Sequence, residues 1–415
     1  MRRRVIVLLV VAVAGLVGNN SHAHTAQAHR ARVSGCEPAT PRGSGSSGAL
    51  AAVHNSFGFS LFDALFAGHA QSNVFLSPAG VALALDMAYD GARGSTRQAM
   101  ARTLGAQGMS QAQVRQRAAA LLSAWQTSPG SEGVTVANSL WARAGIRFRP
   151  QFLRDTRRFY GARVSSLDFR SPSAPATINA WVSCATNGKI TAIVNSIPPT
   201  MLMYLINAVY FHGDWAMPFN AAATRPQPFT RGDGSQVTVP LMQNTGHFPY
   251  YRAANFEAIS LPYHTARFSM TVLLPSKGMT LASLGQRLTD ARWHSWTSHF
   301  QTQYGSLALP RFSLANDFQL NAPLRRLGMG PALDTHADFS GICRQPCRIS
   351  SVRHKTYLNV DEKGTTAAGV TSIGVGATAV QTPQFHMMVD RPFLVSIQDS
   401  ITGSVLFFGA VNNPA

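Results

Sequence analysis

The chain has 415 residues, 45% of them hydrophobic, which is enough to bury the core of a large globular protein. Its 36 Lys and Arg against 18 Asp and Glu give a formal net charge of +18, a balance that favours loose adhesion to anionic surfaces. Beyond the N-terminus no run of about 18 apolar residues occurs, so we expect no membrane span in the mature chain.

The N-terminus predicts a secretory signal. Arg2-Arg-Arg4 precede thirteen apolar or small residues, and a small-x-small sequence ends at Ala23. Thirteen apolar residues are too few for a membrane span, which takes about 20, whereas this order of segments is typical of signal peptides. We therefore expect residues 1–23 to be removed, with Ala28 as the alternative cleavage site, and the mature protein to be secreted and extracellular.

Residues 24–48 are predicted to be a flexible segment, because they are rich in Gly, Ser and Pro from Ser34 onward, and residues 49–415 a single folded domain. Val33-Ser-Gly-Cys36 resembles a bacterial lipoprotein box, but it lies well beyond the apolar core and follows arginines, so lipidation is the weaker alternative. Histidines cluster only at the signal junction, and we expect no metal and no cofactor. They are His22, His24 and His29.

Four cysteines in a secreted chain permit two disulfides. Cys343 and Cys347 lie close in the sequence, so we expect a local disulfide between them. With no histidine or further cysteine nearby, the pair is a weak metal signal. Cys36 and Cys184 then pair with each other or stay free, and the sequence leaves both open.

Nearly all the basic residues are arginines, and they are spread along the whole chain. This distribution is more typical of coding bias than of one binding patch, so we expect at most weak polyanion binding and no specific nucleic-acid binding. The alternative is a polyanion site at the densest group of arginines, which comprises Arg143, Arg147, Arg149, Arg154, Arg157, Arg158 and Arg163.

Hydrophobic periodicity predicts helices and strands along residues 49–415. A Ser-Pro pair at Ser77 is typical of a helix start, and the Gly-rich stretch 90–94 of a helix end. Helices are predicted at 49–66, 79–89, 94–100, 111–125, 148–160, 177–188 and, for the most part, 279–296. Strands are predicted within 73–76, 134–142, 164–169, 201–211, 248–274, 307–314 and 352–360, with a closing hairpin in 385–411.

The run from Asp361 to Val380 begins with three charged residues. From Thr365 to Val380 it has no charged residue, no aromatic residue and no proline. As a strand it would place nothing costly to bury on either face. One face would carry Thr365, Ala367, Gly369, Thr371, Ile373 and Val375, and the other Thr366, Ala368, Val370, Ser372, Gly374 and Gly376. The run is therefore either a buried strand or a strand that joins a sheet later.

Val360-Asp-Glu-Lys-Gly-Thr-Thr-Ala-Ala-Gly369 resembles the hinge of the reactive-centre loop of serpins, a family of serine protease inhibitors. The likeness covers roughly residues 50 to 414 in order, with an insertion at Cys343 to Cys347. It implies a monomer with an α+β fold: a large central, mostly antiparallel sheet, two further sheets, about eight or nine helices and an exposed reactive-centre loop. Further matching stretches are 177–190, 207–219, 309–312, 338–342, 352–360, 390–393 and 406–414.

The resemblance also implies where a protease cuts. Counting fourteen residues beyond Gly364 places the reactive bond at Thr378-Ala379, with Val375 and Val380 as alternative cut sites. The expected protease-contacting residues are Val375, Gly376, Ala377 and Val380. Thr378, preceded by small residues, suits a shallow specificity pocket, so the expected partner is a secreted elastase-like or subtilisin-like serine protease.

Two further groups of residues take their roles from the resemblance. The hinge is expected to comprise Glu362, Gly364, Thr365, Ala367, Ala368 and Gly369. The residues where the sheet opens and the loop enters are expected to be Asn73, Ser77, Asn207, Trp215, Arg311 and His354. Within these groups we expect a buried hydrogen-bond switch of His354 with Asn207 and Ser77. We also expect an ion pair of Glu362 with Arg311, which contributes under about 1 kcal/mol if it is exposed.

These patterns predict an inhibitor that traps a protease when its cleaved loop inserts into the main sheet, and not an enzyme. The alternative is a non-inhibitory serpin that acts as a binding or carrier protein. Such members tend to have charged, bulky or Pro residues in the hinge, which residues 364–369 lack. Thr366 in place of the usual Glu, with Gly374 and Gly376, favours cleavage without trapping. A secreted hydrolase is disfavoured by the absence of Gly-x-Ser-x-Gly and His-Glu-x-x-His motifs.

Overall fold

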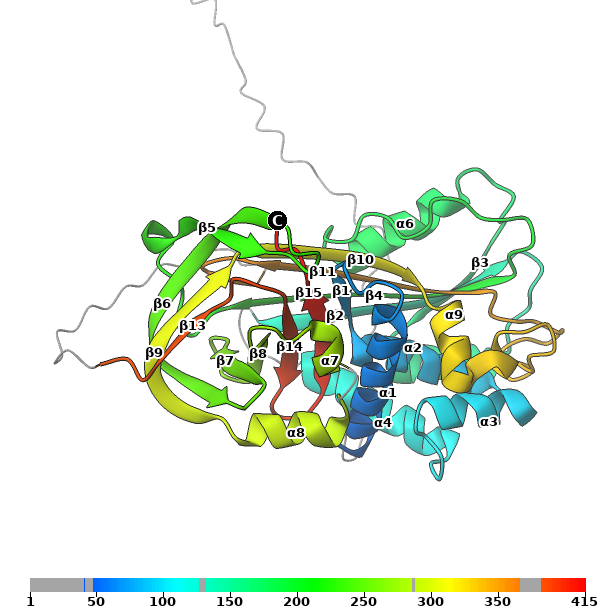
Figure 1. The fold of residues 1–415 in the computed structure, drawn as a ribbon. Helices are drawn as coiled ribbons and strands as arrows, with labels where there is room; N and C mark the ends of the chain where they lie inside the picture. The colour runs from blue at the N-terminus through cyan, green and yellow to red at the C-terminus, as the bar shows by residue number, and fades with distance from the viewer. Residues whose placement is uncertain (1–40, 42–47, 127–131, 286–287, 366–381) are drawn as a thin grey trace, which may run out of the picture. The chain divides into compact units, whose positions relative to one another are not determined.

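The computed structural model describes residues 41, 48–126, 132–285, 288–365 and 382–415, all of which belong to one compact unit, Val33–Ala415. Helices and two sheets make up this part of the chain, which confirms the predicted α+β class (Figure 1). Its α-helices are α1 (Gly48–Phe66), α2 (Pro78–Gly91), α3 (Gly94–Thr103), α4 (Gln111–Gln126), α5 (Pro150–Tyr160), α6 (Ala174–Ala185), α7 (Leu281–Gly285), α8 (Asp290–Ser298) and α9 (Asn321–Leu324). Short helical turns are η1 (Ala221–Ala223), η2 (Arg325–Met329) and η3 (Gly330–Ala332).

A six-stranded, mostly antiparallel sheet has the order β10-β11-β12-β4-β2-β3. Its parallel pairs are β2 with β3 and β4 with β11. Its strands are β2 (Gly133–Arg143), β3 (Arg163–Leu167), β4 (Met203–Asp214), β10 (Phe312–Gln319), β11 (Ser351–Val360) and β12 (Gly364–Thr365).

Different helices cover the two faces of this sheet. Helix α6 packs on one face, where Trp181 meets Trp141 of β2 edge to face, 5.9 Å between ring centroids. The other face, with Val209 and Phe211 of β4, joins the main core that includes α1, α2 and α4 (Figure 1). The alternation of β4 therefore sends successive side chains into two different apolar clusters.

The remaining strands form one nine-stranded sheet of order β1-β15-β14-β8-β7-β6-β9-β13, with β5 paired to β6. The sequence predicted two further sheets, but the long strand β6 pairs with β5 and β9 and, at its other end, with β7, which joins them into one. These strands are β1 (Val74–Leu76), β5 (Arg225–Thr230), β6 (Gln236–Arg252), β7 (Phe256–Pro262), β8 (Phe268–Pro275), β9 (Gln301–Pro310), β13 (Phe385–Met388), β14 (Phe393–Asp399) and β15 (Val405–Val411).

Helix α1 is long and apolar enough to cross a membrane by length and composition alone, yet 61% of its apolar window is buried in the protein. Phe59 and Phe62 both meet Phe408 of β15 edge to face. The hydrophobicity of α1 is thus explained by its position in the core.

Several predicted boundaries move for local reasons. Helix α5 begins at Pro150, two residues late, because proline favours the first turn of a helix. The helix predicted over 279–296 is two helices, and Thr289 caps the second by accepting a hydrogen bond from Arg292 N. The helix expected to end at Gly188 ends at Ala185, before two residues with positive φ, Asn187 and Gly188.

Candidate functional site

The start of the predicted loop lies inside the six-stranded sheet. Strand β12 sits between β11 and β4, with Thr365 opposite Val360 on one side and Gly213 on the other. Away from β12, strands β11 and β4 pair directly and in parallel, from Ser351 opposite Tyr204 to Tyr357 opposite Tyr210. The two strands therefore separate at one end of the sheet, and the hinge residues Gly364 and Thr365 fill the gap.

The other predicted loop residues lie outside the described part of the chain, which stops at Thr365 and resumes at Thr382. These are hinge residues Ala367, Ala368 and Gly369, the contact residues Val375, Gly376, Ala377 and Val380, and the reactive bond Thr378-Ala379.

Thr365 is completely buried, and its hydroxyl is 2.7 Å from the Tyr263 hydroxyl. Tyr263, which sequence reasoning missed, is also completely buried and stacks on Trp215, with 4.6 Å between ring centroids. Burial raises the pKa of Tyr263, so its phenol stays protonated. The only sequence signal for Tyr263 is an aromatic residue after Pro262, which does not suggest contact with the hinge.

Gly364 and Trp215 fix the path of the chain into the sheet. A Cβ atom on Gly364 would lie 2.2 Å from the carbonyl oxygen of Gly213, so only glycine fits. Trp215 donates from its indole Nε1 to Asp361 O and from its backbone N to Lys363 O, both at 2.9 Å. The structure therefore places Trp215 directly against the hinge.

Arg311 and Glu362 form the ion pair predicted from the sequence. Arg311 Nε lies 2.8 Å from each oxygen of Glu362, and Thr224 also donates to this carboxylate. The Glu362 side chain is only 8% exposed and that of Arg311 45%, so the low energy expected of an exposed pair does not apply to it. Burial opposes ionisation of Glu362, but the hydrogen bonds from Arg311 and Thr224 outweigh it and lower its pKa.

His354 joins Ser77 and Asn207 in one buried hydrogen-bond chain. Ser77 N donates to His354 Nε2 at 2.9 Å, so Nδ1 carries the proton and donates to Asn207 Oδ1 at 2.7 Å. Asn207 Nδ2 then donates to Asn138 of β2 at 2.7 Å. Burial lowers the pKa of His354 to about 3, so the ring is neutral at physiological pH.

His354 and Asn207 are also opposite each other in the parallel β11–β4 pairing. A strand that inserted beyond this level would have to separate them. The cluster therefore ties the unopened part of the sheet to the start of helix α2, which Ser77 caps.

Asn73, expected at the opening of the sheet, has its side-chain partners at the end of the chain. Its side chain accepts hydrogen bonds from Asn412 N and Asn413 N and donates to Asn413 O. Because Asn73 precedes β1, the strand that pairs with β15, its amide holds the end of the chain beside β1. Its carbonyl oxygen also accepts a hydrogen bond from Asn316 Nδ2 of β10, at 3.0 Å, and its place at the opening of the sheet stays a prediction.

Cys343 and Cys347 form a disulfide in the structure. Cys184 is also disulfide-bonded, and Cys36 lies outside the described residues. Within the described residues no three His, Cys, Asp or Glu side chains gather as a metal site would require. The predicted histidine cluster at the signal junction lies outside them.

Two surface cavities lie near the residues where the described chain stops, at Thr365, and resumes, at Thr382. One of about 1260 Å³ opens beside the Arg311–Glu362 pair, with Met217 and Phe312 in its wall. The other, of about 470 Å³, adjoins β13, the strand after the loop.

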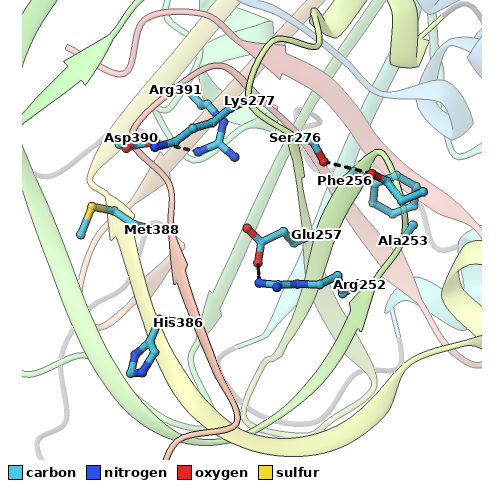
Figure 2. Close-up of a pocket in the computed structure, with 11 residues that line it drawn as sticks. Arg252, Ala253, Phe256, Glu257, Ser276, Lys277, His386, Met388, Asp390 and Arg391 are labelled. Carbon is cyan, nitrogen blue, oxygen red and sulfur yellow. Dashed lines mark hydrogen bonds and ion pairs between the residues drawn. The ribbon is translucent and has the colours of Figure 1, made fainter.

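Figure 2 shows Arg252 and Glu257 on one side of this second cavity, with His386 and Met388 on the other. Its arginines are balanced within the wall, since Arg252 pairs with Glu257 and Arg391 with Asp390. We assign it no ligand.

Comparisons with known proteins agree on one family. The family model described as Serpin (serine protease inhibitor) matches residues 52–414. An uncharacterized serpin-like protein from Thermococcus kodakarensis is 33% identical over 365 residues, covering 87% of this chain and 84% of that protein. The leukocyte elastase inhibitor of Sus scrofa is 32% identical over 378 residues, covering 88% of this chain and 99% of the inhibitor.

Solved structures give the same result. The thermophilic serpin tengpin in its native state superposes with a TM-score of 0.81 at 28% identity, covering 90% of this chain and 97% of tengpin. Human thyroxine-binding globulin superposes with a TM-score of 0.83 at 26% identity, covering 89% of this chain and all of the globulin chain.

Proposed function

Because this chain belongs to the serpin family and has the serpin fold, we propose that it inhibits a serine protease by trapping. The protease cuts the segment after Gly364, and the cut segment then inserts into the six-stranded sheet. The observation that carries this proposal is β12, because its two residues already occupy the gap between β4 and β11 into which the segment would continue.

The register of β12 gives the order of insertion. Thr365 lies opposite Gly213 in antiparallel pairing, so each further loop residue meets the preceding residue of β4. On this register Ala367 would lie opposite Phe211, and Thr371 opposite Asn207. Insertion would therefore meet the His354–Asn207 hydrogen bond when Thr371 arrives.

The same register assigns the two loop faces. Thr365 points into the core with Tyr263, so the other odd-numbered residues would follow it under the sheet. These are Ala367, Gly369, Thr371, Ile373 and Val375, none of them charged. An inserted strand of this kind leaves no buried charge without a partner, which would otherwise cost several kcal/mol.

Insertion supplies the force that stops the protease. In the acylation step the protease serine oxygen bonds to the carbonyl carbon of Thr378, and the Thr378-Ala379 peptide bond breaks, leaving the new amine on Ala379. If residues 365–378 then extend in the sheet at about 3.3 Å each, the attached protease moves on the order of 45 Å. Its active site would be distorted before water hydrolyses the ester.

The target is an elastase-like or subtilisin-like secreted protease. Thr378 and the small residues Gly376 and Ala377 suit a shallow pocket, whereas a trypsin-like pocket requires Arg or Lys. Two similar proteins, from pig and human, are named leukocyte elastase inhibitors, which supports this choice. The predicted signal sequence of residues 1–23 and the disulfide between Cys343 and Cys347 support action outside the cell.

A carrier function is the alternative, because human thyroxine-binding globulin shares the fold. A carrier has no need to insert its loop quickly, so cleavage would release two fragments and an active protease. The two functions therefore differ in what remains attached to the protease.

The test is to incubate the mature protein with pancreatic elastase and, separately, with subtilisin. A trap gives an adduct that survives boiling in detergent and contains the inhibitor up to Thr378, while residues 379–415 are released and identified by mass spectrometry. Cleavage of the loop by both proteases with no adduct, and with full protease activity recovered, would refute inhibition and favour the carrier.

A further inference from the structure

Helix α6 carries a disulfide-bonded cysteine whose partner follows by elimination. The chain has four cysteines, and Cys343 and Cys347 bond to each other. Cys184, in the last turn of α6, is also disulfide-bonded. Since only Cys36 remains, it is the one candidate partner within the chain.

Helix α6 lies over side chains of β4 that the inserting loop would meet. It shares an apolar cluster with Tyr204, Ile206 and Ala208 of this strand. On the register of β12, three even-numbered loop residues would arrive opposite these side chains and on the same face of the sheet. Insertion would therefore need room between the sheet and α6. The three pairs are Val370 with Ala208, Ser372 with Ile206 and Gly374 with Tyr204.

The segment that follows α6 bridges the boundary between β4 and β11. Asn187 Nδ2 donates to the Tyr210 hydroxyl of β4 at 2.5 Å, and Lys355 Nζ of β11 donates to Ala192 O at 2.6 Å. A strand inserted between β4 and β11 would increase their separation by about 4.8 Å. Both hydrogen bonds could then persist only if residues 187–192 changed shape. Opening of the sheet would therefore disturb the attachment of α6.

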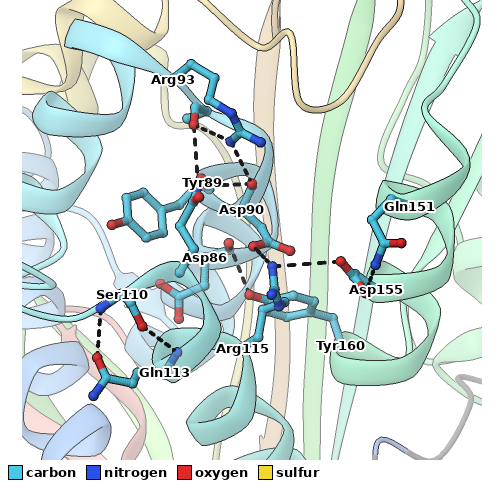
Figure 3. Close-up of polar contacts among 12 residues, drawn as sticks. Asp86, Tyr89, Asp90, Arg93, Ser110, Gln113, Arg115, Gln151, Asp155 and Tyr160 are labelled. Carbon is cyan, nitrogen blue, oxygen red and sulfur yellow. Dashed lines mark hydrogen bonds and ion pairs between the residues drawn. The ribbon is translucent and has the colours of Figure 1, made fainter.

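Other helices are joined to their neighbours by polar side chains. Arg115 of α4 lies 2.5 Å from Asp90 of α2, and the Tyr160 hydroxyl of α5 donates to Asp86 O of α2 at 3.2 Å (Figure 3). Helix α6 contains no charged residue, so its own side chains cannot form an ion pair. A covalent bond at Cys184 would therefore supply a firm attachment that ion pairs cannot provide.

A disulfide to Cys36 would connect α6 to α1 through a short segment. Residues 37–47 separate Cys36 from the start of α1. Pro41, the described residue within this segment, is buried. From Pro41 to Cys36 the chain spans at most about 17 Å even when fully extended. The disulfide would therefore limit how far α6 can move away from the sheet.

We propose that Cys36 and Cys184 form a disulfide that restrains α6, and that this restraint slows insertion of the cut loop into the six-stranded sheet. The second part rests on the proposed protease trapping, whereas the restraint of α6 does not. Slower insertion would protect the uncut protein from inserting its loop prematurely. It would also give the acyl bond to the protease more time to hydrolyse.

Peptide mapping without reduction tests the pairing. The mature protein is alkylated, digested and analysed by mass spectrometry. We expect a linked peptide that contains Cys36 and Cys184. Alkylation of either cysteine, or a link from either one to Cys343 or Cys347, would overturn the proposal.

Hydrogen exchange measured by mass spectrometry tests the restraint, with the other disulfide as the matched control. In Cys36→Ser/Cys184→Ser the amides of α6 should exchange at least about fivefold faster than in the wild type, because the helix opens more often. In Cys343→Ser/Cys347→Ser, which removes a disulfide that is not on α6, they should stay within about twofold.

Helix α2, which is buried along its whole length, is the internal reference for the fold in this experiment. Its exchange should be the same in all three proteins. Equal exchange of α6 in all three proteins would overturn the restraint. Faster exchange of α2 as well as α6 would show that the disulfide stabilises the whole fold, and would overturn it too.

The kinetics of trapping test the effect on insertion. At saturating pancreatic elastase, the limiting rate of adduct formation should be at least about threefold higher in Cys36→Ser/Cys184→Ser than in the wild type. An unchanged or lower rate, together with faster exchange of α6, would overturn the second part of the proposal. If the wild type forms no adduct, the proposed trapping fails and takes the second part with it, while hydrogen exchange still decides the restraint.

Discussion

His354 is neutral because it is buried, and it holds β4 and β11 together through Asn207. In the unfolded chain this ring gains a proton as the pH falls through about 6.5, but in the folded protein only near 3. Between these values the unfolded state binds more protons. The free energy of unfolding therefore falls with falling pH, by up to about 1.4 kcal/mol per pH unit from this residue.

We predict that His354→Gln weakens this acid sensitivity. The variant should be less stable at neutral pH, because its side chain cannot reproduce both ring hydrogen bonds, yet lose less stability than the wild type between neutral pH and about 5. Melting temperatures at several pH values measure both effects. Parallel curves for the two proteins would contradict the assignment of the proton to His354.

In the Arg311–Glu362 pair the titrating group is an acid, and its contribution to stability changes at a lower pH than that of His354. Because the Glu362 pKa is lowered from its usual 4.5, its contribution is complete above that pH and is lost as the pH falls below it.

Arg311→Met should destabilise the hinge by on the order of 1–3 kcal/mol at neutral pH, since it leaves a nearly buried carboxylate without its cation. Added Glu362→Gln should recover part of this loss, because the amide is neutral and still accepts from Thr224. Melting temperature and the rate of loop cleavage measure the effect. No recovery in the double variant would mean that Arg311 acts through packing.

At the scale of elements, the register of strand β12 would determine which loop side chains enter the core in the proposed insertion. Ala367 would lie opposite Phe211, which packs against Tyr263 with 4.7 Å between ring centroids. Thr366 would lie opposite His212, which is half-buried on the other face.

A single negative charge should therefore have opposite effects at neighbouring positions. Ala367→Glu should abolish the detergent-stable adduct while leaving the loop cleavable, because insertion would bury a charge without a partner. Thr366→Glu should retain trapping. Gel electrophoresis in detergent after incubation with elastase distinguishes the adduct from cleaved inhibitor. Loss of the adduct in both variants would mean that the register of β12 does not continue into the loop.

Much of this arrangement was predictable from the sequence, because local patterns set helices and strands. Hydrophobic periodicity predicted the helix over 49–66, which is α1, and the resemblance paired His354 with Asn207 and Arg311 with Glu362. The contact of Tyr263 with Thr365 was missed because it joins residues 102 apart through the packing of two sheets. The partners of the Asn73 amide could not be predicted for a similar reason, since they come from the last residues of the chain.

At the scale of the whole molecule, the proposed trap requires that insertion lowers the free energy. Two residues, Gly364 and Thr365, are already in the sheet, and the thirteen residues 366–378 would follow after cleavage if insertion reaches the reactive bond. Successive inserted residues would form main-chain hydrogen bonds alternately with β4 and with β11, and the inserted strand would cover apolar area.

Protein cut at the loop should therefore melt at a clearly higher temperature than uncut protein, by more than about 10 °C. Calorimetry on material cut with subtilisin and freed of protease measures the difference. An unchanged melting temperature would remove the energy source of the trap.

The pairing of β1 with β15 has a consequence for biosynthesis. Val74 has its strand partner at Ala410, so a ribosome has translated nearly the whole chain before β1 acquires its neighbour. Until then the nascent polypeptide lacks Phe408, whose ring covers Phe59 and Phe62 of α1 in the folded protein, and such exposed apolar surface promotes aggregation. A chain that stops before Asn412 would lack the two hydrogen bonds from Asn412 N and Asn413 N to the Asn73 side chain. The last strand, β15, would then no longer be tied to the residue that precedes β1.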